Sequence, residues 1–108
     1  MQYYKCSVCG FIGERGDHAC PKCGAPADKF VKLSAEDSEK IYMSDRTNDI
    51  HMQIVSLAMK IAKLAEEGIE INLDPTCVSD FKKAKDEAWN IKQRSKAEIA
   101  IHASRGKW

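Results

Sequence analysis

Cys6-Ser7-Val8-Cys9-Gly10 and Cys20-Pro21-Lys22-Cys23-Gly24 are two copies of one pattern, and they decide how the first part of this chain folds. The two-residue spacing within each pair lets the backbone curl so that both sulfurs face one ion. The glycine after each pair accepts a positive φ, which turns the chain and aims backbone N–H groups at the sulfurs. The repeated pattern therefore predicts a tetrathiolate metal site formed by Cys6, Cys9, Cys20 and Cys23.

The rest of the composition argues against several other classes of protein. The net charge of the 108 residues is +1, and no segment is polybasic with exposed stacking aromatics, so nucleic acid is not an expected partner. The most apolar stretch, residues 54–65, is interrupted by Lys60 and Lys63 and is too short to span a bilayer, and no apolar leader precedes the cysteines. We therefore expect a cytoplasmic protein without a membrane partner, in which paired cysteines hold metal rather than form disulfides.

Aromatic residues around the two pairs give the segment a family resemblance. Tyr4-x-Cys6-x-x-Cys9-Gly10-Phe11 and Cys20-Pro21-x-Cys23-Gly24-Ala25-Pro26-x-Asp28-x-Phe30 resemble the rubredoxin family, over roughly residues 3 to 32. Ten residues separate Cys9 from Cys20, a spacer far shorter than in free-standing rubredoxins, so the segment is more similar to the shortened rubredoxin module of rubrerythrins. The resemblance implies a small rubredoxin-like β/knuckle domain with one iron per chain, which cycles between ferrous and ferric states.

The metal itself is not selected by the spacing of the cysteines. Zinc fits the same four-sulfur cage and does no redox chemistry. The flanking residues favour iron as the native metal, and we expect zinc to substitute for it after heterologous expression.

Helical patterns begin after the metal segment. Ser34, with Asp37 three residues later, predicts the start of a helix, and Gly68 predicts its end, although poor helix formers over residues 44–49 allow a break. Asp74-Pro75 predicts the start of a second helix that Gly106 stops. The sequence thus predicts a metal domain over residues 1–33 and an antiparallel two-helix hairpin over residues 34–108, with helices over about 35–67 and 75–104.

Each predicted helix carries a stripe of apolar residues. In the first helix the stripe contains Ile50, Ile54, Leu57, Ile61 and Leu64. In the second it contains Cys77, Phe81, Ala84, Ala88 and Ile91, and continues with the polar residues Ser95, Glu98 and His102. A lone hairpin leaves apolar surface uncovered, so we expect a homodimer in which the helices of two copies form a four-helix bundle.

The polar end of the second stripe lies opposite the start of the first helix in an antiparallel hairpin, which places His51 near Glu98 and His102. Two interpretations stay open: a second ion site or proton-active cluster, and a hydrogen-bond network at the end of the bundle. The chain lacks the Glu-x-x-His pairs of ferritin-like di-iron sites, so the peroxidase site that the rubrerythrin resemblance invites is not expected.

The leading hypothesis is a one-electron carrier with a mononuclear Fe(Cys)4 centre, an electron-transfer protein rather than an enzyme, serving oxygen or peroxide detoxification or related redox chemistry. The resemblance implies a flavin-dependent reductase as electron donor and a rubrerythrin-like or flavodiiron enzyme as acceptor. One alternative is a structural zinc ribbon joined to a helical protein-interaction module. Another is a peroxide-reducing enzyme with a second metal site in the helices.

Overall fold

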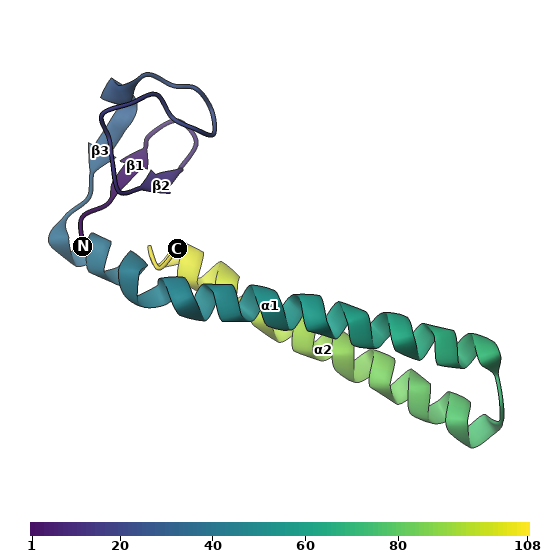
Figure 1. The fold of residues 1–108 in the computed structure, drawn as a ribbon. Helices are drawn as coiled ribbons and strands as arrows, with labels where there is room; N and C mark the ends of the chain where they lie inside the picture. The colour runs from purple at the N-terminus through teal and green to yellow at the C-terminus, as the bar shows by residue number, and fades with distance from the viewer. The chain divides into compact units, whose positions relative to one another are not determined.

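A small sheet is followed by two long helices in the computed structural model, which describes residues 1–108 (Figure 1). The chain divides into two compact units, one made of residues 1–44 with Lys107 and the other of residues 45–106 with Trp108. This division falls inside the first helix, whereas the sequence placed the domain boundary at residue 33. The first turns of that helix group with the sheet, and Ser38 in them is hydrogen-bonded to Tyr3, the residue just before the first strand.

Three short strands make up the sheet. Strand β1 (Tyr4–Cys6) lies in the centre, between β2 (Ile12–Gly13) and β3 (Phe30–Lys32), and pairs antiparallel with both. A single 3-10 turn, η1 (Ala27–Lys29), leads directly into β3. Within β1, Cys6 pairs with Phe30, which brings the first cysteine pair beside the residues that follow the second. The predicted β/knuckle fold is confirmed.

Helix α1 (Ala35–Ile71) begins where the sequence predicted. The Ser34 side chain accepts a hydrogen bond from the N–H of Asp37 at 3.1 Å, which caps the helix. One turn further on, the hydroxyl of Ser38 is fully buried and accepts a hydrogen bond from the N–H of Tyr3 at 3.2 Å. Because an unpaired buried N–H is costly, this bond ties the segment before β1 to the start of α1.

The predicted end of α1 at Gly68 was wrong, since the helix continues to Ile71. The break that residues 44–49 allow does not occur. Gly68 lies within the helix because Phe81 of the second helix packs against it: a Cβ added there would lie 2.4 Å from Cδ2 of that ring. The helix ends instead at Asn72, which takes a left-handed φ of 54° and donates its N–H to the Gly68 carbonyl at 3.3 Å. Asparagine tolerates this conformation better than most residues do.

Helix α2 (Pro75–Ser104) has the predicted ends. Asp74 caps it by accepting the N–H of Cys77 at 2.7 Å, and Pro75 occupies the first helical position, where its missing N–H costs nothing. After Ser104 the chain turns at Gly106, whose φ is 71°.

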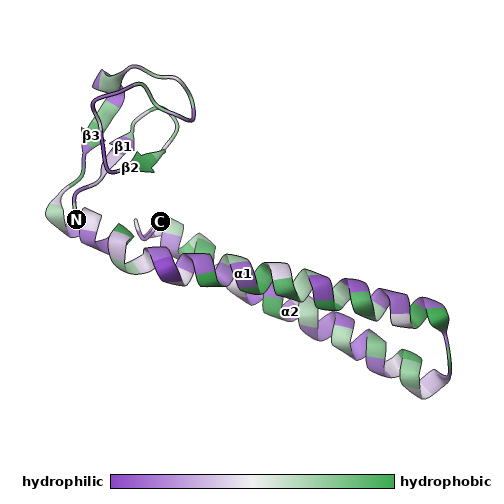
Figure 2. Cartoon of the chain, viewed as in Figure 1, coloured by the Kyte–Doolittle hydropathy of each residue, from purple (hydrophilic) through white to green (hydrophobic).

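The two helices lie side by side in antiparallel orientation (Figure 1). Ala58 and Ala65 of α1 and Ala88 of α2 are almost completely buried. The larger residues predicted for the apolar stripe of α1 are much more open, with Leu57 56% and Leu64 66% exposed. Apolar residues recur along the length of α1 (Figure 2), and the large ones among them are mostly exposed. Neither helix contains an apolar stretch that would cross a membrane.

Candidate metal centre

Both cysteine pairs lie in the same kind of backbone turn. In the first turn the N–H of Gly10 donates to the Cys6 carbonyl at 2.9 Å, and the N–H of Cys6 donates to the Phe11 carbonyl at 2.8 Å. The segment Cys20–Ala25 repeats both bonds with the same lengths. Gly10 and Gly24 have φ values of 84° and 75°, which a residue with a Cβ rarely adopts. The repeated sequence pattern thus becomes two equivalent knuckles.

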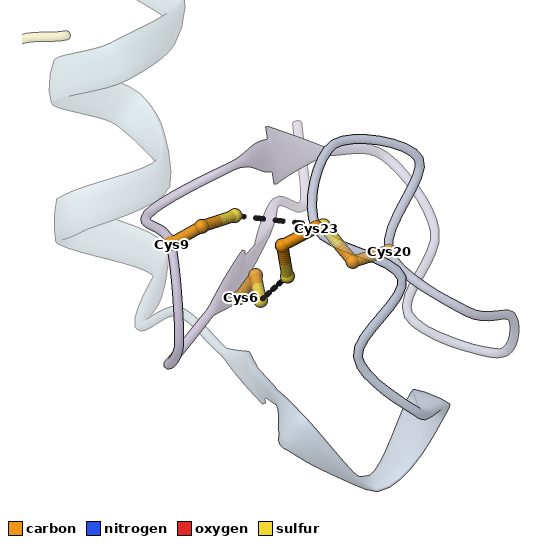
Figure 3. A group of neighbouring side chains, drawn as sticks. All are labelled: Cys6, Cys9, Cys20 and Cys23. Atoms are coloured by element: carbon orange, nitrogen blue, oxygen red, sulfur yellow. Dashed lines mark hydrogen bonds between the residues drawn. The ribbon is translucent and has the colours of Figure 1, made fainter.

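The four sulfurs of the knuckles point toward one another (Figure 3). The Sγ atoms of Cys6 and Cys23 are 3.7 Å apart, those of Cys9 and Cys20 are 3.6 Å apart, and all four lie within 4.8 Å of one another. A tetrahedral site with metal–sulfur bonds of about 2.3 Å requires sulfurs about 3.8 Å apart. The cage therefore has the dimensions of a tetrathiolate metal site, and the fifth cysteine, Cys77 on α2, lies outside it.

Backbone N–H groups face the two buried sulfurs. The N–H of Cys9, and to a smaller extent that of Val8, lowers the pKa of the Cys6 thiol, although burial acts in the opposite direction. At Cys20 burial raises the pKa, but the N–H groups of Cys23 and Lys22, together with smaller contributions from the thiols of Cys9 and Cys23, outweigh it and lower the pKa to about 6. These N–H groups stabilise thiolates, which are the form that binds metal.

The sulfur of Cys23 shows why the cage needs a cation. The N–H of Ala25 favours its thiolate, but loss of solvent and the neighbouring sulfurs of Cys9, Cys20 and Cys6 together raise its pKa to about 11. Like charges this close disfavour one another, so the four thiols do not all ionise by themselves near neutral pH. A bound metal ion of charge +2 or +3 supplies the compensating charge, and the residues present fit such an ion.

Aromatic rings from the metal domain contact one another, and the four cysteines differ in their exposure to solvent. The ring of Phe30 makes edge contacts with Phe11, at 6.4 Å between centroids, and with His18, at 5.9 Å. Cys23 is exposed, whereas Cys6 and Cys20 are almost completely buried. The second cysteine of a pair is thus more open than the first.

The polar residues of the hairpin also come together as the sequence suggested. His51 Nδ1 lies 3.0 Å from the hydroxyl of Ser95, and His102 Nδ1 lies 2.6 Å from the side-chain oxygen of Asn48. His102 Nε2 is 3.7 Å from a carboxylate oxygen of Glu98, and the two histidine rings make an edge contact at 6.1 Å.

These contacts form a hydrogen-bond network inside the hairpin. Asn48 and Ser95 are buried, and each supplies a partner to one histidine. Sequence reasoning missed the role of Ser95; its place on the inward-facing stripe of α2 was the available signal. In the cysteine cage the ligand atoms lie close enough together to hold one metal ion. The structure does not bring the ligand atoms of His51, Glu98 and His102 together in this way, so a second ion site there stays a prediction.

A three-stranded antiparallel sheet whose two knuckles enclose one four-sulfur cage defines a rubredoxin-like metal-binding domain. Residues 4–31 match the family model of the rubrerythrin, rubredoxin-like domain. The chain is also 34% identical over 79 residues to Reverse rubrerythrin-1 of Clostridium acetobutylicum, an alignment that covers 71% of this chain and 39% of that protein. The chain thus spans about two fifths of the length of the curated relative it matches. A comparison with solved structures gave no match.

The matches confirm the resemblance that the cysteines and aromatic residues suggested. An aligned segment of 79 residues is longer than the metal-binding unit, so the similarity extends into the helices. Together with the cage, the two matches support a metal-binding protein of the redox type, built from a rubrerythrin-type rubredoxin domain and a helical hairpin.

Proposed function

We propose that the chain is a one-electron carrier with a mononuclear Fe(Cys)4 centre. The observation that carries the proposal is the four-sulfur cage with backbone N–H groups directed at its buried sulfurs. Iron bound by four thiolates exchanges one electron between its ferrous and ferric states. The N–H groups would stabilise the more negative, reduced centre, and the hydrogen-bonded knuckles would keep the sulfurs in place in both states.

The more accessible sulfurs of the cage support exchange of electrons with other proteins. Cys23 is exposed and Cys9 is half-buried, so two of the four sulfurs lie where a partner can approach them. We propose a flavin-dependent reductase as donor and a rubrerythrin-like or flavodiiron enzyme as acceptor, in the removal of oxygen or peroxide or in related redox chemistry. These partners follow from the resemblance of the metal domain to rubredoxins and rubrerythrins. We place the protein in the cytoplasm, where the thiols stay reduced.

Metal content and redox behaviour test this proposal directly. Protein purified anaerobically from its own host should contain one iron per chain, absorb visible light when oxidised and titrate as a reversible one-electron couple. A colourless native protein with one zinc per chain would contradict the proposal and favour the zinc-ribbon interaction module.

A pair of cysteine variants supplies the matched control. Cys9→Ser removes one ligand of the cage, so the visible spectrum should be lost or strongly altered. Cys77→Ser changes a cysteine outside the cage and should leave the spectrum and the potential unchanged. Equal effects of the two substitutions would show that the colour does not come from the cage.

A further inference from the structure

Large apolar side chains form a continuous seam along the outer side of α1. The seam, named here the α1 seam, consists of Ile50, Ile54, Leu57, Ile61, Leu64 and Ile71. Gly68 occupies the position between Leu64 and Ile71. When it is counted, the seam positions follow one another at alternating steps of four and three residues. This is the heptad spacing of helices that pack along a common seam. Five of the six residues are exposed, and Ile54 is half-buried.

Helix α2 leaves most of this seam open, because it packs on a neighbouring side of α1. It reaches the seam at Gly68, which Phe81 contacts, and near Ile54, which shares a pocket with Ile91. Three of the seam residues are each followed in the chain by a residue that faces α2. The three pairs are Ile50 and His51, Leu57 and Ala58, and Leu64 and Ala65. Small residues thus serve the contact inside the hairpin, whereas the larger residues of the same helix remain on the surface. A helix with two adjacent apolar sides is typical of a bundle of more than two helices.

We infer that the α1 seam binds the α1 seam of a second copy of this chain, in antiparallel orientation. The available area favours such a partner. Each seam residue exposes on the order of 60–80 Å² of apolar surface, so two copies would bury roughly 700–1,000 Å². The aliphatic stems of the flanking residues raise this to about 1,200 Å², the lower limit of stable protein interfaces.

Charges beside the seam determine the orientation. The exposed positions on the side away from α2, at steps of seven residues, are Arg46, Gln53, Lys60 and Glu67. In an antiparallel pair centred between Ile54 and Leu57, Arg46 lies beside Glu67 of the second copy, and Gln53 beside Lys60 of the second copy. The two-fold symmetry repeats both contacts, so every charge at this edge meets an opposite charge or an amide.

A parallel pair fits less well. It would bring Lys60 and Gln53 toward the alanines that α2 already covers, and so force α2 aside. The antiparallel pair instead places both α2 helices on the same side of the two seams, which gives a four-helix arrangement without moving either hairpin.

The inference is tested by sedimentation equilibrium of the metal-loaded full chain at concentrations from about 1 to 100 μM. The dimer Kd is measured for each variant, and the ratio of two Kd values gives the change in the free energy of dimerisation. The expected mass is twice the 12.1 kDa of one chain. Leu57→Glu should weaken dimerisation about 100-fold or more, because the carboxylates would be buried unpaired near the two-fold axis. Met59→Glu is the matched control: Met59 is 47% exposed on another side of α1, so this variant should stay dimeric.

A charge exchange tests the orientation. Glu67→Lys places like charges at both symmetric contacts and should raise the dimer Kd about three- to tenfold, with a smaller effect at high salt. Adding Arg46→Glu should restore the affinity, although the two positions are 21 residues apart on one helix and do not meet within a chain. Failure of this restoration would overturn the antiparallel register.

Other outcomes bear on the seam itself. A chain that stays monomeric up to 100 μM, or a dimer insensitive to Leu57→Glu, would overturn the inference. A different protein would then be the candidate partner of the seam. Far-ultraviolet circular dichroism verifies that the variants keep their helices. The visible spectrum and the potential should be unchanged in Leu57→Glu, so failure of the dimer and failure of the electron-carrier function are distinguished.

Discussion

Gly68 offers a quantitative test of how the hairpin is packed. In the interior of an exposed helix, Gly→Ala normally stabilises a protein by about 1 kcal/mol. Here the new Cβ would lie 2.4 Å from both Cδ2 and Cε2 of Phe81 and 2.6 Å from its Cζ. Carbon atoms in contact normally stand about 3.5–4.0 Å apart, so the overlap is about 1 Å or more with three ring atoms.

Displacing the Phe81 ring should reverse the usual sign of this substitution. Overpacking of this kind costs about 1–3 kcal/mol, and the overlap with three atoms places Gly68→Ala near the upper value. Subtracting the gain in helix propensity leaves a net loss of about 2 kcal/mol. Phe81→Ala alone should cost about 2–3 kcal/mol, below the figure for a fully buried ring because Phe81 is half-buried. In that background, Gly68→Ala should instead stabilise by about 1 kcal/mol.

The assay is a double-mutant cycle measured by urea unfolding of the metal-loaded chain at one fixed concentration, followed by circular dichroism at 222 nm. The expected coupling between the two sites is about 3 kcal/mol. Ser56→Ala, at an exposed position of α1, serves as control and should have the same small effect in both backgrounds. The reasoning would be refuted if Gly68→Ala stabilised the wild-type chain or had the same effect with and without the Phe81 ring.

Three further predictions concern the metal, a helix cap and the polar network. Removal of the metal by a chelator should unfold the sheet, which has almost no other core, while most of the signal at 222 nm persists because α1 and α2 contain 37 and 30 residues. Asp74→Ala should lower the unfolding free energy by about 1 kcal/mol through loss of the bond to the Cys77 N–H, and Asp74→Ser should retain most of it, as urea unfolding would show. Asn48→Ala should cost about 1–3 kcal/mol because it leaves Nδ1 of the half-buried His102 without its partner, whereas an unchanged unfolding midpoint would argue against the network.

The metal domain was predictable because its determinants are local. Each knuckle is specified within six residues by two cysteines and a glycine. The repetition of the pattern indicates that the two knuckles belong to one metal site. The caps at Ser34 and Asp74 are equally local, since each side chain bonds an N–H three residues along the chain. The corresponding helix starts therefore agree with the sequence.

The packing of the hairpin was less predictable because it depends on residues far apart in the chain. Gly68 looked like a helix end, but its role depends on Phe81, which lies across the hairpin. The apolar stripe of α1 was visible in the sequence, but nothing local indicated that α2 would pack on Ala58 and Ala65 and leave Leu57 and Leu64 open. A periodic pattern identifies an apolar side of a helix, whereas its neighbour is set by tertiary structure.

The equivalence of the two knuckles has a consequence for the kinetics of metal loading. Because each knuckle is held by its own two backbone hydrogen bonds, either one can capture an ion first through its pair of sulfurs. The ten residues between Cys9 and Cys20 then close a loop to deliver the other pair, an event that takes on the order of 10–100 ns. Closure this fast does not discriminate between ions that fit the same cage. Occupancy should therefore follow the relative supply of iron and zinc at the time the chain folds.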